Sequence, residues 1–193
     1  MRLSISHQTT YNYQDPVRAS IQYLRLTPQE SRRQHVLNWQ LDLPGAVQAQ
    51  RDPYGNILHV LTMEQPHESI VIGARGVVDI DEHCDSEHDS RSPLPYLRPT
   101  CLTQPDAALR EFALHVCGNG RQRRDLIRLM HALLAAMPYS PGVTTVESTA
   151  AAAFASAAGV CQDHAHAFIA CARSLGIPAR YVSGYLYSDD LSH

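Results

Sequence analysis

The sequence contains no apolar run near the roughly 20 residues that a helix needs to cross a bilayer. It also lacks a strong charge of either sign, because its formal net charge is −3 over 193 residues. A protein that binds nucleic acid or an anionic membrane usually carries a basic patch. The first residues, MRLSISHQTTYNY, alternate polar and apolar side chains and lack the apolar segment of a signal peptide. We therefore expect a cytoplasmic protein that binds neither nucleic acid nor membrane.

Paired cysteines are missing as well. The five cysteines are an odd number, and none stands in a CxxC pair. This pattern argues against a disulfide framework and against a thiolate zinc site. His83, Cys84 and His88 lie among carboxylates, but their spacing fits an exposed acidic loop better than an ordered metal site. We predict no metal, and we expect most cysteines, such as Cys171, to be reduced packing residues.

The first 81 residues have the pattern of β-structure. Residues 37–43, LNWQLDL, alternate apolar and polar side chains, as a half-buried strand does. RDPYGN, at residues 51–56, has the proline, glycine and asparagine of a turn between two strands. Six or so strands with short turns predict an antiparallel sandwich or barrel-like domain over residues 1–81.

Residues 82–99 are polar, acidic and then proline-rich, which predicts an exposed linker. The helical period begins after it. Thr103 and Asp106 resemble a capping box, Gly118 is a plausible helix end, and Ser148 or Thr149 could cap a short alanine-rich helix. A further helix is predicted over residues 161–175 and a strand over residues 179–187. The fold class is therefore α+β, with a second domain over residues 100–193.

Cys161 stands where a helix should begin, just after Gly159. Only the thiolate attacks a carbonyl carbon, and a free cysteine titrates near ~8.5. A helix N-terminus favours the anion through its unpaired N–H groups and its dipole. The N–H groups of Cys161 and Gln162 could also donate to a developing oxyanion. The alternative for any such cysteine is simple packing.

Several separated stretches resemble the bacterial transglutaminase-like proteins, a family often described as cysteine proteases. The stretches GVCQDHAH, at residues 159–166, and LGIPARYVSGY, at residues 175–185, resemble the core of the family, and MPYSPGVTTV resembles the element before it. The stretches LSISHQTTYNYQDPV, SIQYLRLTPQ and DPYGN resemble the β-rich region that precedes that core. The resemblance covers nearly the whole chain.

The resemblance implies a papain-like arrangement, in which the cysteine begins a helix packed on an antiparallel sheet. It makes Cys161 the nucleophile and places a histidine and an aspartate on later strands. The chain ends at SDDLSH, so His193 either precedes the catalytic histidine or is that histidine. The aspartate is missing. We therefore expect the core to be C-terminally incomplete and the chain to be a fragment of a longer protein.

Other residues near Cys161 have weaker assignments. His164 and His166 lie on the same predicted helix as Cys161, so neither is expected to reach across to the thiol as its base. His166 is expected to pack or to hydrogen-bond behind the site, and His164 to fill space that is often aromatic in the family. Asp163 matches the motif, but an aspartate in the first turn also stabilises the helix dipole. Gln162 could line the acyl site or be an exposed polar residue, and Tyr139 could border the cleft or pack.

Two functional hypotheses follow. The first is a thiol enzyme, a cysteine protease or amide hydrolase without a cofactor, whose acyl-enzyme on Cys161 is resolved by water or, in a transamidase, by an amine. Its substrate would be a peptide or protein amide. The second is a non-catalytic peptide-binding module on the same fold. Because the Asp partner is expected to be missing, and with it the His partner unless His193 is that residue, we expect the 193-residue chain itself to be inactive. Edges exposed by truncation could pair two copies.

Overall fold

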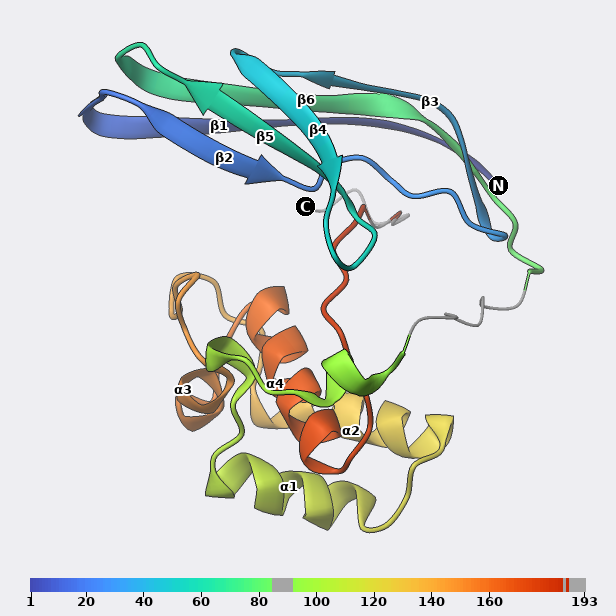
Figure 1. The fold of residues 1–193 in the computed structure, drawn as a ribbon. Coiled ribbons are helices and arrows are strands. Elements are labelled where there is room, and N and C mark those ends of the chain that lie inside the picture. Colours follow the sequence, from blue (N-terminus) through green and yellow to red (C-terminus); the bar gives the residue numbers. More distant parts are fainter. Residues whose placement is uncertain (85–91, 186, 188–193) are drawn as a thin grey trace. The chain divides into compact units, whose positions relative to one another are not determined.

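The chain folds into two compact units in the computed structural model, which describes residues 1–84, 92–185 and 187 (Figure 1). Unit 1 comprises Met1–Asp89 and Gly184–His193, and unit 2 comprises Ser90–Ser183. The predicted boundaries at residues 81 and 100 fall close to this division, but the last residues group with unit 1. None of the helices among the described residues is long and apolar enough to cross a membrane.

Unit 1 is built from two three-stranded antiparallel sheets (Figure 1). The sheet orders are β1-β6-β3 and β2-β5-β4. The strand bounds are β1 (Arg2–Val17), β2 (Ser20–Leu24), β3 (Gln34–Asp42), β4 (Ala46–Arg51), β5 (Ile57–Met63) and β6 (His67–Ile80). Leu61 of β5 packs with Ile70 and Ile72 of β6, so the two sheets share a core. The predicted antiparallel β domain is confirmed as a sandwich.

The central strand β6 has a glycine at the place where the sheet holds the large side chain of Trp39. Its even-numbered residues from Ile70 to Val78 are buried, as the alternation of side chains along a strand predicts. Among them Gly76 leaves room for Trp39 of β3, because a Cβ at Gly76 would lie 2.4 Å from Cε3 of the indole. Tyr185 also belongs to unit 1, with ring centroids 6.0 Å from Trp39 and 5.5 Å from His7. The end of the described chain therefore returns to this sheet.

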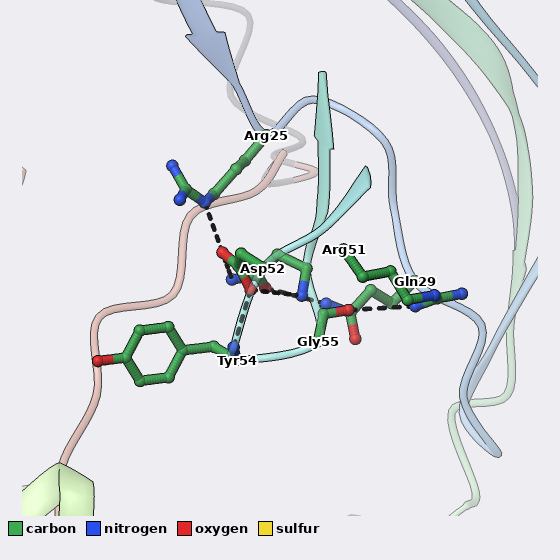
Figure 2. Close-up of polar contacts among 7 residues, drawn as sticks. Arg25, Gln29, Arg51, Asp52, Tyr54 and Gly55 are labelled. Atoms are coloured by element: carbon green, nitrogen blue, oxygen red, sulfur yellow. Dashed lines mark hydrogen bonds and ion pairs between the residues drawn. The ribbon is translucent and has the colours of Figure 1, made fainter. Parts of the chain in front are cut away.

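The turn between β4 and β5 is organised by Asp52 (Figure 2). One carboxylate oxygen accepts from the backbone N–H groups of Tyr54 and Asn56, both at 2.9 Å. The other accepts from Arg25 Nε at 2.8 Å and from Asn56 Nδ2 at 2.9 Å. Gly55 has a φ of 81°, which favours glycine. The turn predicted from RDPYGN is confirmed.

Unit 2 is helical. Its bounds are η1 (Leu94–Leu97), η2 (Cys101–Thr103), α1 (Ala107–Cys117), α2 (Arg123–Ala136), α3 (Ala150–Ala155) and α4 (Cys161–Ser174). Helix α4 contacts the other three α-helices, and Figure 1 shows it in their midst. The shared core includes Leu109, Leu129, Leu133, Ala167 and Cys171. Among the described residues of this unit, β-structure is limited to the bridge between Tyr139 and Gly159.

Two local predictions about unit 2 are wrong. Asp106 is itself the N-cap of α1 and accepts from Leu109 N–H at 2.8 Å, whereas Thr103 belongs to η2. Residues 179–185 and 187 do not form the predicted strand. The backbone of Ala179 bonds elsewhere: its N–H donates to Tyr96 O at 3.1 Å, and its carbonyl accepts from Arg173 Nη2 at 2.7 Å. These hydrogen bonds take the place of the backbone pairing that a strand would make at Ala179.

Candidate active site

Cys161 is the first residue of helix α4, and its side chain is exposed. Val160 is the N-cap, with an extended backbone at φ −101° and ψ −178°. The first N–H groups of a helix have no acceptor within the helix, so they face the space around its first residues. The predicted start of the helix at the cysteine is confirmed, and the thiol is accessible from solvent.

Asp163 explains why the helix begins there. Its carboxylate accepts the N–H of Val160 at 2.8 Å, which satisfies the backbone just before Cys161. A Cβ at Gly159 would lie 2.7 Å from Asp163 Cβ and 2.9 Å from its Oδ2, so only glycine leaves room for this side chain. Asp163 itself is buried, with 1% of its surface exposed. The structural role expected of Asp163 is the one observed here.

A loop of residues 142–149 lies against the first turns of α4. Thr144 Oγ1 donates to Asp163 Oδ2 at 2.6 Å, and Gln162 Nε2 donates to the carbonyl of Val146 at 3.2 Å. The backbone of Ser148 lies near the ring of His166 and acts to raise its pKa. The three residues predicted to surround the nucleophile therefore share one neighbour, this loop. Thr144 and Val146 were not identified as site residues from the sequence.

The surface around this loop is partly apolar. Val146 is 77% exposed, and Val143 and Tyr139 are also exposed. Tyr139 pairs with Gly159 in the isolated bridge, so the segment before the loop runs beside the residues that precede Cys161. The role of Tyr139 at the edge of a cleft stays a prediction.

His164 does not face the thiol as a free base. Its Nδ1 lies 2.9 Å from the carbonyl of Val160, and its Nε2 hydrogen-bonds to the carbonyl of Met137. Each ring nitrogen thus lies beside a backbone oxygen, and because a neutral imidazole has one N–H, it donates to one of the two carbonyl groups at a time. This geometry fits the expectation that His164 fills structural space.

His166 is buried, and its pKa lies below the ordinary histidine value. The main cause is burial, which disfavours the charged ring, while the charge of Asp163 and the backbone of Ser148 act in the opposite direction. Its ring lies 5.6 Å from that of Tyr181, at a tilt of 55°. Within the described part of the chain, its Nδ1 has no hydrogen-bond partner. His166 therefore packs behind the loop.

The other cysteines differ from Cys161 in their surroundings. Cys171 is fully buried, and burial raises the pKa of its thiol to about 12. Burial likewise raises the pKa of Cys117. Cys101 is exposed but belongs to the short η2 turn. Cys161 is therefore the exposed thiol of unit 2 that stands at the start of an α-helix.

Two predictions from the sequence cannot be placed. His193, the candidate base, and His88 of the acidic stretch lie outside the described residues. Among the residues that are described, no three His, Cys, Asp or Glu side chains gather as metal ligands would.

Comparison with known proteins gives two successive family matches. Residues 3–79 match the bacterial transglutaminase-like N-terminal region, and residues 111–192 match the transglutaminase-like superfamily. A Mycobacterium leprae protein is 29% identical over 199 residues, which cover 96% of this chain and 71% of that protein. A Mycobacterium tuberculosis protein is 29% identical over 211 residues, which cover 97% of this chain and 67% of that protein.

A solved structure from Cytophaga hutchinsonii, described as a "putative cysteine protease", has a similar fold. The TM-score is 0.74 at 20% identity, and the match covers 92% of this chain and 65% of that chain. The likeness confirms the predicted α+β fold class. The chain thus spans less than two thirds of the length of that structure's chain.

Proposed function

Because this chain belongs to the bacterial transglutaminase-like proteins, we propose that it is part of a thiol enzyme that cleaves amide or peptide bonds through Cys161. The observation that carries the proposal is the exposed Cys161 side chain at the first position of α4. The first-turn N–H groups there favour an anion, whether thiolate or oxyanion. The description of the Cytophaga hutchinsonii structure as a "putative cysteine protease" agrees with this class of chemistry.

The proposed reaction has two steps. The Cys161 thiol gives its proton to a base and its sulfur adds to the amide carbonyl carbon, while the C=O electron pair moves to oxygen. The oxyanion collapses, the C–N bond breaks, and the amine leaves with the proton from the base, so a thioester remains on sulfur. Water then attacks the thioester, and the products are the carboxylic acid and the free thiol. The steps require no metal or organic cofactor.

The base is proposed to come from outside the described residues. The His164 ring lies between the carbonyl groups of Val160 and Met137, and His166 is buried behind the 142–149 loop. His193 remains the candidate from the sequence. We accordingly expect negligible amide turnover by the 193-residue chain, and measurable turnover by the longer Mycobacterium leprae relative.

An amine in place of water would make the same acyl-enzyme a transamidase. We favour hydrolysis because it needs no binding site for an amine. Labelled casein offers a generic protein substrate: release of small peptides measures hydrolysis, and incorporation of dansylcadaverine measures transamidation. The proposal expects serine at the position equivalent to Cys161 to abolish turnover by the relative, whereas turnover by this chain stays negligible with or without Cys161→Ser.

The absence of a free histidine beside Cys161 among the described residues also suits a binding module without chemistry. Such a module would retain labelled casein peptides with equal affinity in the Cys161→Ser variant. It would also give no covalent adduct at Cys161. Turnover that disappears with Cys161→Ser contradicts this second function.

A further inference from the structure

We propose that Asp163 is a positioning residue of this enzyme: through Thr144 it fixes the 142–149 loop against the first turn of α4, and so fixes the backbone that presents Cys161. The proposal rests on the proposed function, in which Cys161 is the nucleophile. Asp163 acts through its neighbours and has no contact with the reacting atoms.

One oxygen of Asp163 makes both contacts. Oδ2 accepts from the N–H of Val160 at 2.8 Å and from the hydroxyl of Thr144 at 2.6 Å. The first donor immediately precedes Cys161, and the second belongs to the loop. Because the carboxylate is 1% exposed, water does not compete for these bonds. A shift of the loop therefore moves the carboxylate, and with it the backbone at the nucleophile.

The neighbouring residues reinforce the same link. Gln162, directly after Cys161, donates to the carbonyl of Val146 at 3.2 Å, and the backbone of Ser148 lies near the ring of His166. Inside the loop, Thr145 N–H donates to Ser148 Oγ at 2.9 Å, which stiffens the turn. The loop is thus joined to α4 by two hydrogen bonds, and the Asp163–Thr144 bond is the shorter of them.

Helix α2 provides a comparison within the same unit. Asp125 also lies in the first turn of its helix and accepts from the backbone N–H of Gln122 at 3.0 Å. Its other oxygen binds Arg128 of the same helix at 3.1 Å. Asp125 therefore caps a helix without holding a distant loop. What distinguishes Asp163 is the contact with Thr144, 19 residues away in the sequence.

The hydrogen bond between Asp163 and Thr144 matters for the proposed reaction because it helps to fix the position of the nucleophile. A nucleophile misplaced by about 1 Å can lose on the order of a hundredfold in rate, so precise support of the reacting residue matters. A cap alone would start the helix. The bond to Thr144 in addition fixes the 142–149 loop against the first turn of α4, in which Cys161 lies.

The test removes the hydrogen bond from Thr144 to Asp163, called the tie, and keeps the bond from the Val160 N–H to Asp163, called the cap. Thr144→Val replaces the hydroxyl with a methyl group of similar shape, Thr144→Ser retains the hydroxyl, and Thr145→Val makes the same change at a neighbour whose hydroxyl does not reach α4. All variants carry Cys101→Ser so that Cys161 is the main accessible thiol. Hydrogen exchange of the backbone amides in residues 142–149 measures the loop. Acylation of Cys161 by p-nitrophenyl acetate, followed by intact mass, measures the nucleophile.

Thr144→Val is expected to speed exchange in the loop by about tenfold and to slow acylation at saturating ester by a similar factor, with the half-saturating concentration changed less than about twofold. Thr144→Ser should restore both values, and Thr145→Val should leave acylation unchanged. Unchanged loop exchange in Thr144→Val overturns the tie. Faster exchange with unchanged acylation overturns the positioning role. Faster exchange in a chain whose Cys161 is never acylated supports the tie and contradicts the proposed function instead.

Discussion

Two histidines of helix α4 stand close together in the sequence and have different surroundings. His164 is held between the carbonyl groups of Val160 and Met137, whereas His166 is buried against Tyr181 and the backbone of Ser148. Their spacing from Cys161 predicts that neither serves as its base, and this stays a prediction. The partners themselves could not be predicted, because Met137 lies 27 residues from His164.

Burial of His166 makes the stability of unit 2 depend on pH. The pKa of His166 is lowered in the fold, so the unfolded chain, with an ordinary value near ~6.5, binds more protons between the two values. The free energy of unfolding should therefore fall as pH drops below about 6.5. Urea unfolding followed by helix circular dichroism at several pH values measures this. His166→Gln should flatten the decline, and exposed His131→Gln should not; equal pH profiles for all three proteins would contradict the assignment.

Burial also distinguishes the cysteines by how accessible their thiols are. The pKa of Cys171 is raised to about 12 and that of Cys117 is raised, both by burial. At pH 8 iodoacetamide should label Cys161 and Cys101 in the folded chain, and should reach the two buried thiols only after urea is added. Peptide mass spectrometry locates the labels. Labelling of Cys171 in the folded chain would show that unit 2 is not packed as described.

At the scale of the elements, glycine at position 76 allows β3 and β6 to pair beneath an indole ring. A methyl group there would lie 2.4 Å from both Trp39 Cε3 and Asn38 O. We expect Gly76→Ala to lower the free energy of unfolding of unit 1 by about 1–3 kcal/mol, as overpacking does. Fluorescence of Trp39, the single tryptophan, reports the unfolding in urea.

Gly184→Ala is the matched control for Gly76→Ala, because a Cβ at Gly184 has no atom within 4 Å. Its unfolding midpoint should equal that of the parent chain. Equal midpoints for both alanine variants would contradict the packing of Trp39 over Gly76.

The β4–β5 turn is expected to be sensitive to acid. Bonds from Asn56 and Arg25 hold the pKa of Asp52 far below its usual range. A lowered pKa contributes stability that is complete above the unfolded value, near ~3.9, and is lost as pH falls below it. Unfolding of unit 1, followed by Trp39 fluorescence, should show this loss below about pH 4, and Asp52→Asn should reduce it. Exposed Asp15→Asn is the control; an identical loss in Asp52→Asn would contradict the role of the carboxylate.

Local patterns predicted most elements because they depend on near neighbours. The alternation in residues 37–43 located the β3 strand, the position of Cys161 after Gly159 located the start of α4, and RDPYGN located its turn. The predicted strand over residues 179–187 failed, since a strand requires a partner. In the structure Tyr96 and Arg173 take the backbone groups of Ala179 instead. Tyr96 is far from Ala179 in the sequence, and no local pattern marks Arg173, six residues away, as its partner.

At the scale of the whole molecule, the order of a β unit and a helical unit was visible in the sequence, and both family matches follow that order. The return of Tyr185 to unit 1 was not visible. It depends on ring contacts with His7 and Trp39, which are far from it along the chain. The 142–149 loop was missed as part of the site for the same reason, because its role follows from bonds to α4.

The central claim is that Cys161 is a nucleophile that forms an acyl-enzyme. The most direct measurement is the rate at which p-nitrophenyl acetate acylates each thiol of the folded chain, with the acetyl group located by peptide mass spectrometry. Cys101 provides an internal comparison, since it is also exposed. The account predicts an acetyl thioester on Cys161 that forms at least about tenfold faster than any on Cys101. Equal rates at the two cysteines, or no adduct at Cys161, would contradict it.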